Sequence, residues 1–140
     1  MHGYGLVNGA PADLSFVDPS MADAAGGGAL VTTVADLATV LAAVREGALF
    51  ADRATFATMA SFVEAEGPGG LVGYGLGLEK YLFPGGLEII GHLGGTAGYR
   101  SGTFYIRKLD LSLAFAMSVE GDPTAIMVAA LKVLAPEALH

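Results

Sequence analysis

The residues best suited to chemistry lie in one segment, 89–99 (IIGHLGGTAGY), where a histidine follows an apolar run and precedes a run of small residues. His92 can donate a hydrogen bond or exchange a proton near neutral pH. Gly94 and Gly95 carry no side chain, so their backbone N–H groups are open to close approach, as an oxyanion hole requires. The segment predicts either part of an acyl-transfer site or, more plainly, a glycine-rich turn with a histidine packed beside it.

Other catalytic signatures are incomplete. Residues 98–102 (GYRSG) resemble a nucleophile elbow, but Ser101 stands one place too late and precedes a predicted strand, where the elbow needs a helix. No Gly-x-Gly-x-x-Gly opens a helix, and no Gly-Lys pair marks a phosphate loop. The chain has no cysteine, which excludes Cys-based zinc sites. Its histidines are His2, His92 and His140, two of them at the termini, so a metal site would lack ligands, and we expect neither a metal nor a cofactor. The acidic pairs are expected to be solvated loop residues: Asp18 with Asp23, and Glu64 with Glu66.

Composition excludes several functional classes. With 53% hydrophobic and 15% charged residues among 140, the chain has enough apolar surface to fold, which excludes intrinsic disorder. Fourteen acidic against seven basic residues give a net charge of −7, which argues against a nucleic-acid partner. No stretch reaches the roughly 18 apolar residues of a membrane span, and the first residues do not resemble a signal peptide. The compartment is not determined by these features.

The first half predicts an irregular segment followed by two helices. Residues 1–31 are rich in Gly, Pro, Asn and Asp, show little periodicity, and end in three glycines at 26–28. Thr33 is a predicted N-cap for a helix that ends at Gly47. A second helix is expected from Asp52 through Val63, ending before residues 67–68 (GP).

From residue 71 the period changes to two, which predicts an antiparallel meander of about four strands. The expected strands are 72–78, 87–91 after a turn at 84–86 (PGG), 103–107 and 111–119. Asp122 followed by proline then opens a helix that is apolar nearly all round and stops at Pro136, so we expect it to be buried on several sides. The fold class predicted is α+β, an antiparallel sheet flanked by helices.

Three motifs in this order resemble the carboxy-terminal part of the serine β-lactamase-like hydrolases, a group with class C β-lactamases, D-alanyl-D-alanine carboxypeptidases and related esterases. They are residues 27–38 (GGALVTTVADLA), 74–79 (YGLGLE) and 91–99 (GHLGGTAGY), with residues 3–4 (GY) ahead of them. The resemblance covers essentially all 140 residues. It implies the carboxy-terminal portion of a single β-lactamase/transpeptidase-like domain, with residues 1–66 forming an irregular segment plus a helical part and 67–140 an antiparallel meander plus a terminal helix.

The resemblance also implies roles for one segment. His92, Leu93 and Gly94 match the family's Lys/His-x-Gly motif, so His92 and Gly94 would belong to the catalytic site and the Gly95 N–H would supply half of the oxyanion hole. Leu93 and Thr96 would lie against the substrate. The family often carries Thr or Ser at the middle position, where the hydroxyl helps to bind a substrate carboxylate. Leu93 has no hydroxyl, which favours an ester-like or other substrate over β-lactam or peptide carboxylates.

The family's other two motifs are not found. No serine here has lysine three residues later, and no tyrosine has asparagine two later, so both Ser-x-x-Lys and Tyr-x-Asn are missing. The resemblance thus implies a fragment of a serine acyl-hydrolase that is inactive alone and acts on a small-molecule ester, amide or β-lactam only in an intact parent. Because half a domain leaves its partner surface bare, self-association through exposed apolar surface is also predicted.

Two alternatives remain open at this point. The chain could be a stand-alone, non-catalytic binding or interaction module that reuses the fold, or a degenerate product of a truncated gene that needs a separate amino-terminal chain. The coding sequence upstream of Met1 discriminates among them, because an open frame with both missing motifs supports the enzyme.

Overall fold

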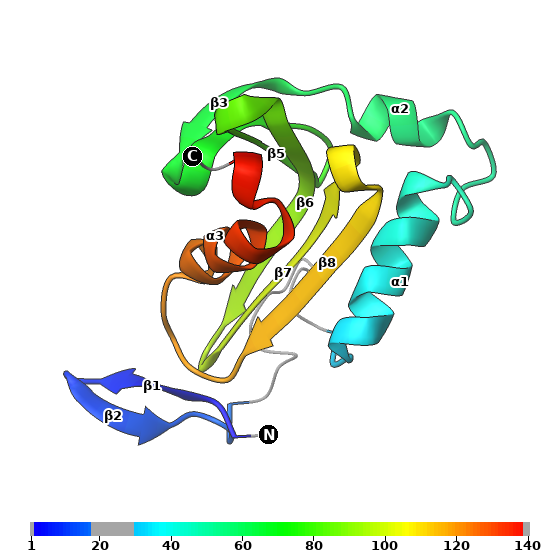
Figure 1. Cartoon of the computed structure of the whole chain (residues 1–140). Helices are drawn as coiled ribbons and strands as arrows, with labels where there is room; N and C mark the ends of the chain where they lie inside the picture. The colour runs from blue at the N-terminus through cyan, green and yellow to red at the C-terminus, as the bar shows by residue number, and fades with distance from the viewer. Residues whose placement is uncertain (1, 18–29, 139–140) are drawn as a thin grey trace.

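The computed structural model describes residues 2–17 and 30–138 and confirms the predicted α+β class, with one six-stranded antiparallel sheet at its centre (Figure 1). The strands follow one another in space in chain order, β3-β4-β5-β6-β7-β8, which is a simple meander. The sheet strands are β3 (Val63–Gly67), β4 (Leu71–Tyr74), β5 (Glu79–Phe83), β6 (Leu87–Thr96), β7 (Tyr99–Ile106) and β8 (Leu111–Met117). The remaining elements are the hairpin β1 (Tyr4–Val7) and β2 (Ala10–Asp13) and the helices α1 (Val34–Arg45), α2 (Thr55–Met59) and α3 (Pro123–Leu134).

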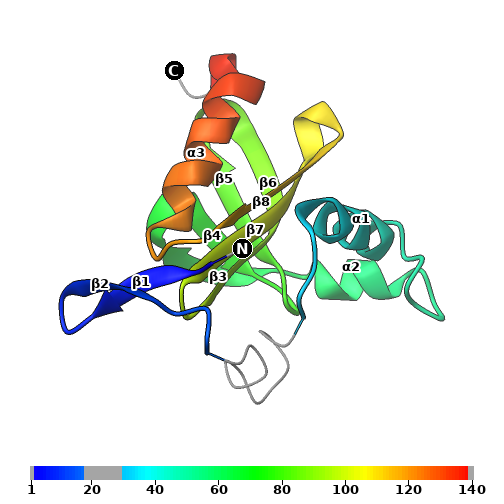
Figure 2. The same cartoon turned by 90° about the horizontal axis from the view of Figure 1, so that it is seen from below.

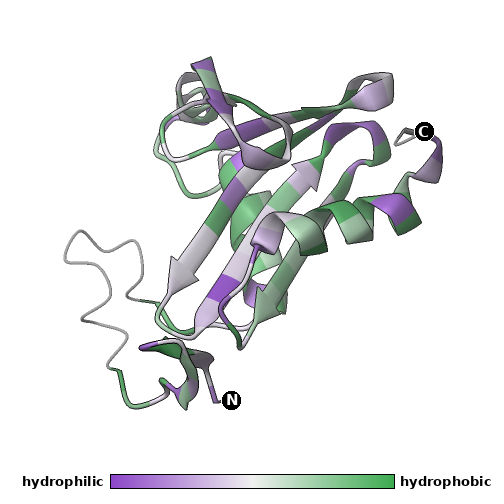
Figure 3. Ribbon diagram, turned by 90° about the vertical axis from the view of Figure 1, so that its left-hand side faces the viewer, coloured by the Kyte–Doolittle hydropathy of each residue, from purple (hydrophilic) through white to green (hydrophobic). Residues whose placement is uncertain are grey.

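Helices cover both faces of the sheet: α3 packs on one face, and α1 and α2 lie on the other (Figures 1 and 2). Side chains alternate between the faces along each strand, so β6 and β7 contribute apolar residues to both layers. Figure 3 shows hydrophobic residues along α3 and the strands beneath it. The larger core lies under α3 and contains Tyr81, Phe83, Leu87, Ile89, Phe104, Ile106, Met127, Leu131 and Ala135. The smaller core on the opposite face contains Leu41, Leu78 and Ile90.

Two helices begin where their caps predict. The Thr33 hydroxyl accepts a hydrogen bond from the Asp36 N–H at the start of α1, and Asp122 accepts one from the Thr124 N–H at the start of α3. The Thr124 hydroxyl also donates to Asp122, and these two bonds hold the pKa of that carboxyl below its usual value. The expectation that α3 is buried on several sides is wrong: Met127 and Leu131 are fully buried, but Val133 is 80% exposed because α3 contacts the sheet along a single stripe.

The second predicted helix is much shorter than expected. It ends at Met59, and Val63 begins strand β3, where it pairs with Tyr74. The strand expected over 72–78 also stops early: β4 ends at Tyr74, and a turn closed by the Gly75 N–H and the Leu78 carbonyl leads directly into β5. Pairing across the sheet therefore decided both boundaries. The expected strand after the turn at 84–86 is present and extends to Thr96 as β6.

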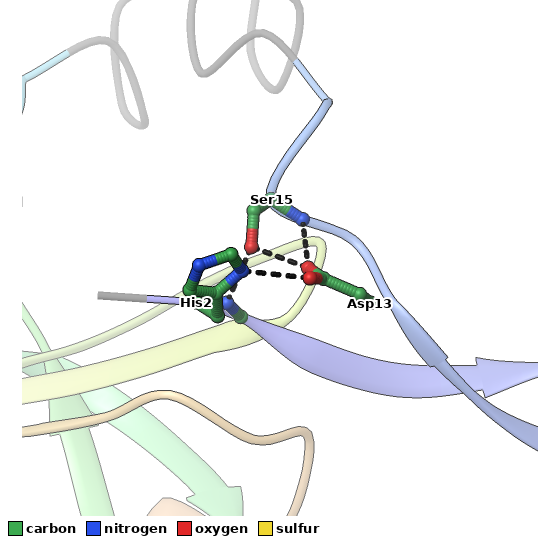
Figure 4. Close-up of polar contacts among 4 residues, drawn as sticks. His2, Asp13 and Ser15 are labelled. Carbon is green, nitrogen blue, oxygen red and sulfur yellow. Dashed lines mark hydrogen bonds and ion pairs between the residues drawn. The ribbon is translucent and has the colours of Figure 1, made fainter.

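The prediction of an irregular segment over residues 1–31 is wrong at its start, because residues 4–13 form a β-hairpin. Asn8 and Gly9 both have positive φ (52° and 81°), the conformation of a tight hairpin turn for which Asn-Gly is the preferred sequence. The Tyr4 N–H donates to the Ser118 carbonyl, and the Tyr4 carbonyl accepts from the Glu120 N–H; these two bonds attach the hairpin to the chain after β8. Figure 4 shows Asp13 of β2 between His2 and Ser15, which both bond to its carboxylate. The three glycines at 26–28 lie outside the described residues.

Candidate functional site

The predicted site residues lie together on the end of β6, where the sheet becomes locally narrower. Strand β5 begins at Glu79, which pairs with Gly91, whereas β6 continues to Thr96 and pairs there with β7 alone. Among the described residues, no strand pairs with residues 92–96 on the β5 side. His92, Leu93, Gly94, Gly95 and Thr96 therefore form an open sheet edge, which we call the β6 edge.

Two side chains form hydrogen bonds with the backbone of Leu93, the first residue of this edge whose N–H and C=O face the open side. The Leu93 N–H donates to Glu79 Oε2 at 2.9 Å, and the Leu93 carbonyl accepts a hydrogen bond from Nδ1 of His92. In an antiparallel strand, alternate residues direct their backbone groups to the same side. Since Leu93 faces the open side, Gly95 directs its N–H and C=O to that side as well, and Gly95 is exposed. Gly95 is thus the next position along the β6 edge where a ligand can meet the backbone.

His92 lies close to two polar groups from two neighbouring strands. Its Nε2 is 2.7 Å from the hydroxyl of Tyr74 in β4, and the two rings meet edge to face at 87°. The carboxylate of Glu79 in β5 lies 3.9 Å from the same nitrogen. The His92 side chain is 42% exposed, so the imidazole is anchored by these contacts while one side stays accessible.

Glu79 is the best-buried charged group of the site, with its side chain 14% exposed. It accepts hydrogen bonds from the Leu93 N–H and from the Tyr81 hydroxyl, the latter at 3.0 Å. Burial, with the Glu79 carboxylate nearby, raises the pKa of Tyr81, which keeps that hydroxyl a neutral donor. The sequence analysis did not assign functional roles to Glu79 and Tyr74, although both stand at the ends of the 74–79 segment (YGLGLE) that it singled out.

At two glycines of β6, neighbouring atoms leave no room for a side chain. A β-carbon on Gly91 would lie 1.9 Å from the carbonyl oxygen of Thr103, and one on Gly94 would lie 2.7 Å from Oγ of Ser101. At the end of the strand, Nη1 of Arg100 donates to the carbonyls of Thr96 and Tyr99, both at 2.8 Å. These bonds close the turn between β6 and β7 and so fix the direction of the β6 edge.

A small apolar cavity of about 150 Å³ lies beside His92, between α1 and the sheet. Thr103, which pairs with His92 from β7, also borders it, and the Thr103 hydroxyl is buried without a hydrogen-bond partner among the residues that the structure describes. The other lining residues are Leu37, Val40, Leu41, Val44, Met59, Gly77, Leu78 and Gly91.

Other candidates from the sequence are not assembled into sites. Ser101 lies inside strand β7, which begins at Tyr99 and not at Thr103 as predicted, so residues 98–102 do not form a nucleophile elbow. His2, Asp13 and Ser15 are residue types of a catalytic triad, but the aspartate stands in the middle and Ser15 bonds to it rather than to His2 (Figure 4). Asp18, Asp23 and His140 lie outside the described residues.

Residues 2–17 and 30–138 contain no group of three or more side chains that could hold a metal ion. No helix in the same ranges is long and apolar enough to cross a membrane.

Comparison with solved structures identifies neighbours for this fold. A D-stereospecific amidohydrolase from Streptomyces sp. matches with a TM-score of 0.77 and 31% identity over 92% of this chain and 38% of its own. The D-amino acid amidase from Ochrobactrum anthropi SV3 matches in complexes with L-phenylalanine amide and with D-phenylalanine. Each complex has a TM-score of 0.74 and 25% identity over 95% of this chain, covering 40% and 42% of the amidase, respectively. No protein-family model matches the sequence, and no curated protein sequence does.

The chain thus spans about two fifths of the length of these solved structures. The neighbours have the fold of the penicillin-recognising serine hydrolases, which supports kinship with that superfamily. The α+β structure of this chain, with its antiparallel sheet and few helices, matches a carboxy-terminal part of the β-lactamase/transpeptidase-like fold.

Proposed function

We propose that this chain is the carboxy-terminal part of a serine acyl-hydrolase and supplies one wall of its active site. The observation that carries the proposal is the β6 edge, where Glu79 and His92 occupy the backbone groups of Leu93 and the N–H of Gly95 faces outward. An N–H in this position suits a carbonyl oxygen that gains negative charge. The match to two amidohydrolases supports the same class of reaction.

In this proposal the chain stabilises charge and does not provide the nucleophile. A serine hydroxyl from outside these 140 residues attacks the acyl carbon while a base, also from outside them, takes its proton; a C–O bond forms, and the carbonyl π electrons move to oxygen. The Gly95 N–H donates to that oxyanion. The carbonyl then re-forms as the bond to the leaving amine or alcohol breaks, the base returns the proton to the leaving group, and water hydrolyses the acyl-enzyme to release the acid and the serine. Removing one such donor costs about 10²- to 10³-fold in turnover in enzymes of this type.

The proposed substrates are small neutral acyl compounds, above all amides of amino acids. The amidase neighbour is seen with phenylalanine amide, and an amide lacks the carboxylate that a hydroxyl at the position of Leu93 would bind. Esters of the same acids are chemically equivalent at the acyl carbon and belong to the proposed class. His92, Leu93, Gly94, Gly95 and Thr96 are the proposed contact residues, with His92 available for hydrogen bonding or proton exchange.

The test begins with the coding sequence upstream of Met1, where we expect Ser-x-x-Lys and Tyr-x-Asn motifs in frame. The protein encoded by that longer frame is then assayed for ammonia release from phenylalanine amide. Gly95→Pro, which deletes the N–H, should lower turnover at least 10²-fold, and Gly95→Ala, which keeps it, should lower turnover much less. An upstream sequence without either motif, or equal losses in the two variants, would reject the proposal and favour a non-catalytic module.

A further inference from the structure

We propose that Tyr74 is a positioning residue for His92: its hydroxyl donates to Nε2 and holds the imidazole as the tautomer protonated on Nδ1. The 2.7 Å contact between Tyr74 Oη and His92 Nε2 and the contact from Nδ1 to the Leu93 carbonyl together carry the inference. The importance of this contact for catalysis rests on the proposed function above. The tautomer of His92 does not depend on that proposal, because it follows from the hydrogen-bond donors and acceptors around the ring.

The assignment follows from what each group can do. A backbone carbonyl only accepts hydrogen bonds, so Nδ1 of His92 must carry the proton that reaches the Leu93 oxygen. In the neutral imidazole Nε2 is then an acceptor, and the only donor that Tyr74 can offer is its hydroxyl proton. A phenylalanine at position 74 would leave Nε2 without this donor and remove one of the two hydrogen bonds that hold the ring.

The groups facing His92 come from several elements. Tyr74 from β4 and Glu79 from β5 are the titratable ones, with the Glu79 carboxylate 3.9 Å from Nε2. Thr103 from β7 and the α1 side chains of the cavity are uncharged. Among these groups Tyr74 is the one within hydrogen-bond distance of Nε2, at 2.7 Å, whereas the Glu79 carboxylate lies 3.9 Å away.

The fold holds Tyr74 firmly enough for this role. Tyr74 pairs with Val63 on one side and with Glu79 on the other, so neighbouring strands flank it. The turn that follows is fixed by the Leu76 N–H, which donates to the Met59 carbonyl at 2.9 Å. A β-carbon on Gly75 would lie 2.2 Å from that same carbonyl oxygen, which shows how closely the turn approaches α2.

The inference is tested by ¹⁵N NMR of the histidine side chains in the 140-residue chain, at a pH where His92 is neutral. We expect wild-type His92 to show a protonated Nδ1 and an unprotonated Nε2, and Tyr74→Phe to move the spectrum toward the Nε2-protonated form. Tyr81→Phe is the matched control, since that hydroxyl bonds to Glu79 and should leave the His92 tautomer in place. A wild-type spectrum with the proton on Nε2 would overturn the inference, even if Tyr74→Phe fails to fold. So would identical His92 signals in wild type and Tyr74→Phe.

A kinetic readout separates this inference from the proposed function. In the longer protein, Tyr74→Phe should lower kcat about tenfold with little change in KM, because the ring is misplaced while substrate contacts persist. If the tautomer is as described but that protein hydrolyses no acyl substrate, the proposed function fails and the positioning of His92 stands. Equal effects on kcat from Tyr74→Phe and Tyr81→Phe would overturn a specific role for Tyr74.

Discussion

Gly91 of β6 and Thr103 of β7 approach so closely that a β-carbon on Gly91 would lie 1.9 Å from the Thr103 carbonyl oxygen. The obstacle is backbone, which cannot rotate away as a side chain can. We therefore expect Gly91→Ala to lower the free energy of unfolding by about 3 kcal/mol or more, the upper range for overpacking. Gly95→Ala, four residues along the same strand, meets only the flexible Arg100 side chain at 3.1 Å and should cost about 1 kcal/mol or less. Urea denaturation of both variants checks this, and equal losses would contradict it.

Thr103 also leads to a stabilising prediction. Its hydroxyl is buried without a partner among the described residues, and an unsatisfied buried hydroxyl is unfavourable. Thr103→Val keeps the β-branched shape and replaces the hydroxyl with a methyl group, so it should raise the unfolding free energy by about 1 kcal/mol. Thr103→Ser, which keeps the hydroxyl and loses the methyl group, should be destabilising. A less stable valine variant would show that the hydroxyl has a partner.

The hairpin at the amino-terminal end should respond to acid in a narrow range. The Ser15 hydroxyl and N–H, followed by His2, lower the pKa of Asp13 from 3.8 to about 2. A lowered pKa means that the folded chain favours the carboxylate, so this stabilisation is complete above about pH 4 and is lost as pH falls toward 2. A ¹³C NMR titration of the Asp13 carboxyl measures the value.

Ser15→Ala is the matching variant for that titration. It removes the largest contribution, the hydroxyl donor, so the pKa of Asp13 should rise toward 3.8. An unchanged pKa in Ser15→Ala, or a wild-type value near 3.8, would contradict the hydrogen-bonding arrangement of Figure 4.

Exposed apolar side chains predict that the chain binds a hydrophobic dye or self-associates. Val133 on α3 is 80% exposed, Val63 at the sheet edge 68% and Leu76 in the turn after β4 63%. Dye fluorescence and analytical ultracentrifugation of the purified chain test this. Val133→Gln should reduce dye binding with little loss of stability, since the side chain contributes little to the core. A monomer without dye binding would contradict the prediction and favour a stand-alone module.

Hydrolysis by the chain alone should be undetectable with nitrocefin and with p-nitrophenyl esters. Loss of a nucleophilic serine costs about a millionfold in turnover in other serine hydrolases, and the proposed nucleophile lies outside this chain. In the longer protein, His92→Ala should lower turnover about 10²-fold, the scale of one positioned proton-transfer group. If the purified chain hydrolyses these esters in proportion to its concentration, and Ser101→Ala abolishes the activity, the nucleophile is within the chain and the proposal is wrong.

The local sequence was sufficient to predict the structure where the conformation depends on a few neighbouring residues. Thr33 and Asp122 start their helices because each cap satisfies backbone N–H groups within three residues of itself. The meander from residue 71 follows from alternating side chains and from turns at 84–86 and 107–110. Asn8-Gly9 is an equally local signal for a hairpin, although the Gly, Pro and Asp residues around it are typical of a loop.

Only the tertiary structure decided where helix α2 ends and what surrounds His92. Val63 has a helical spacing from Met59, but pairing with Tyr74 across the sheet draws it into a strand. The contact between Tyr74 and His92, 18 positions apart in the chain, joins β4 to β6 across β5. It depends on β5 beginning only at Glu79, opposite Gly91, while β6 continues beyond that pair. The sequence identified the histidine and its glycines as a candidate site by their chemistry. The tertiary structure determined which of their backbone groups remain unpaired, because β5 pairs with β6 only as far as Gly91. Which N–H and C=O groups are used in strand pairing depends on the neighbouring strand and not on the local sequence.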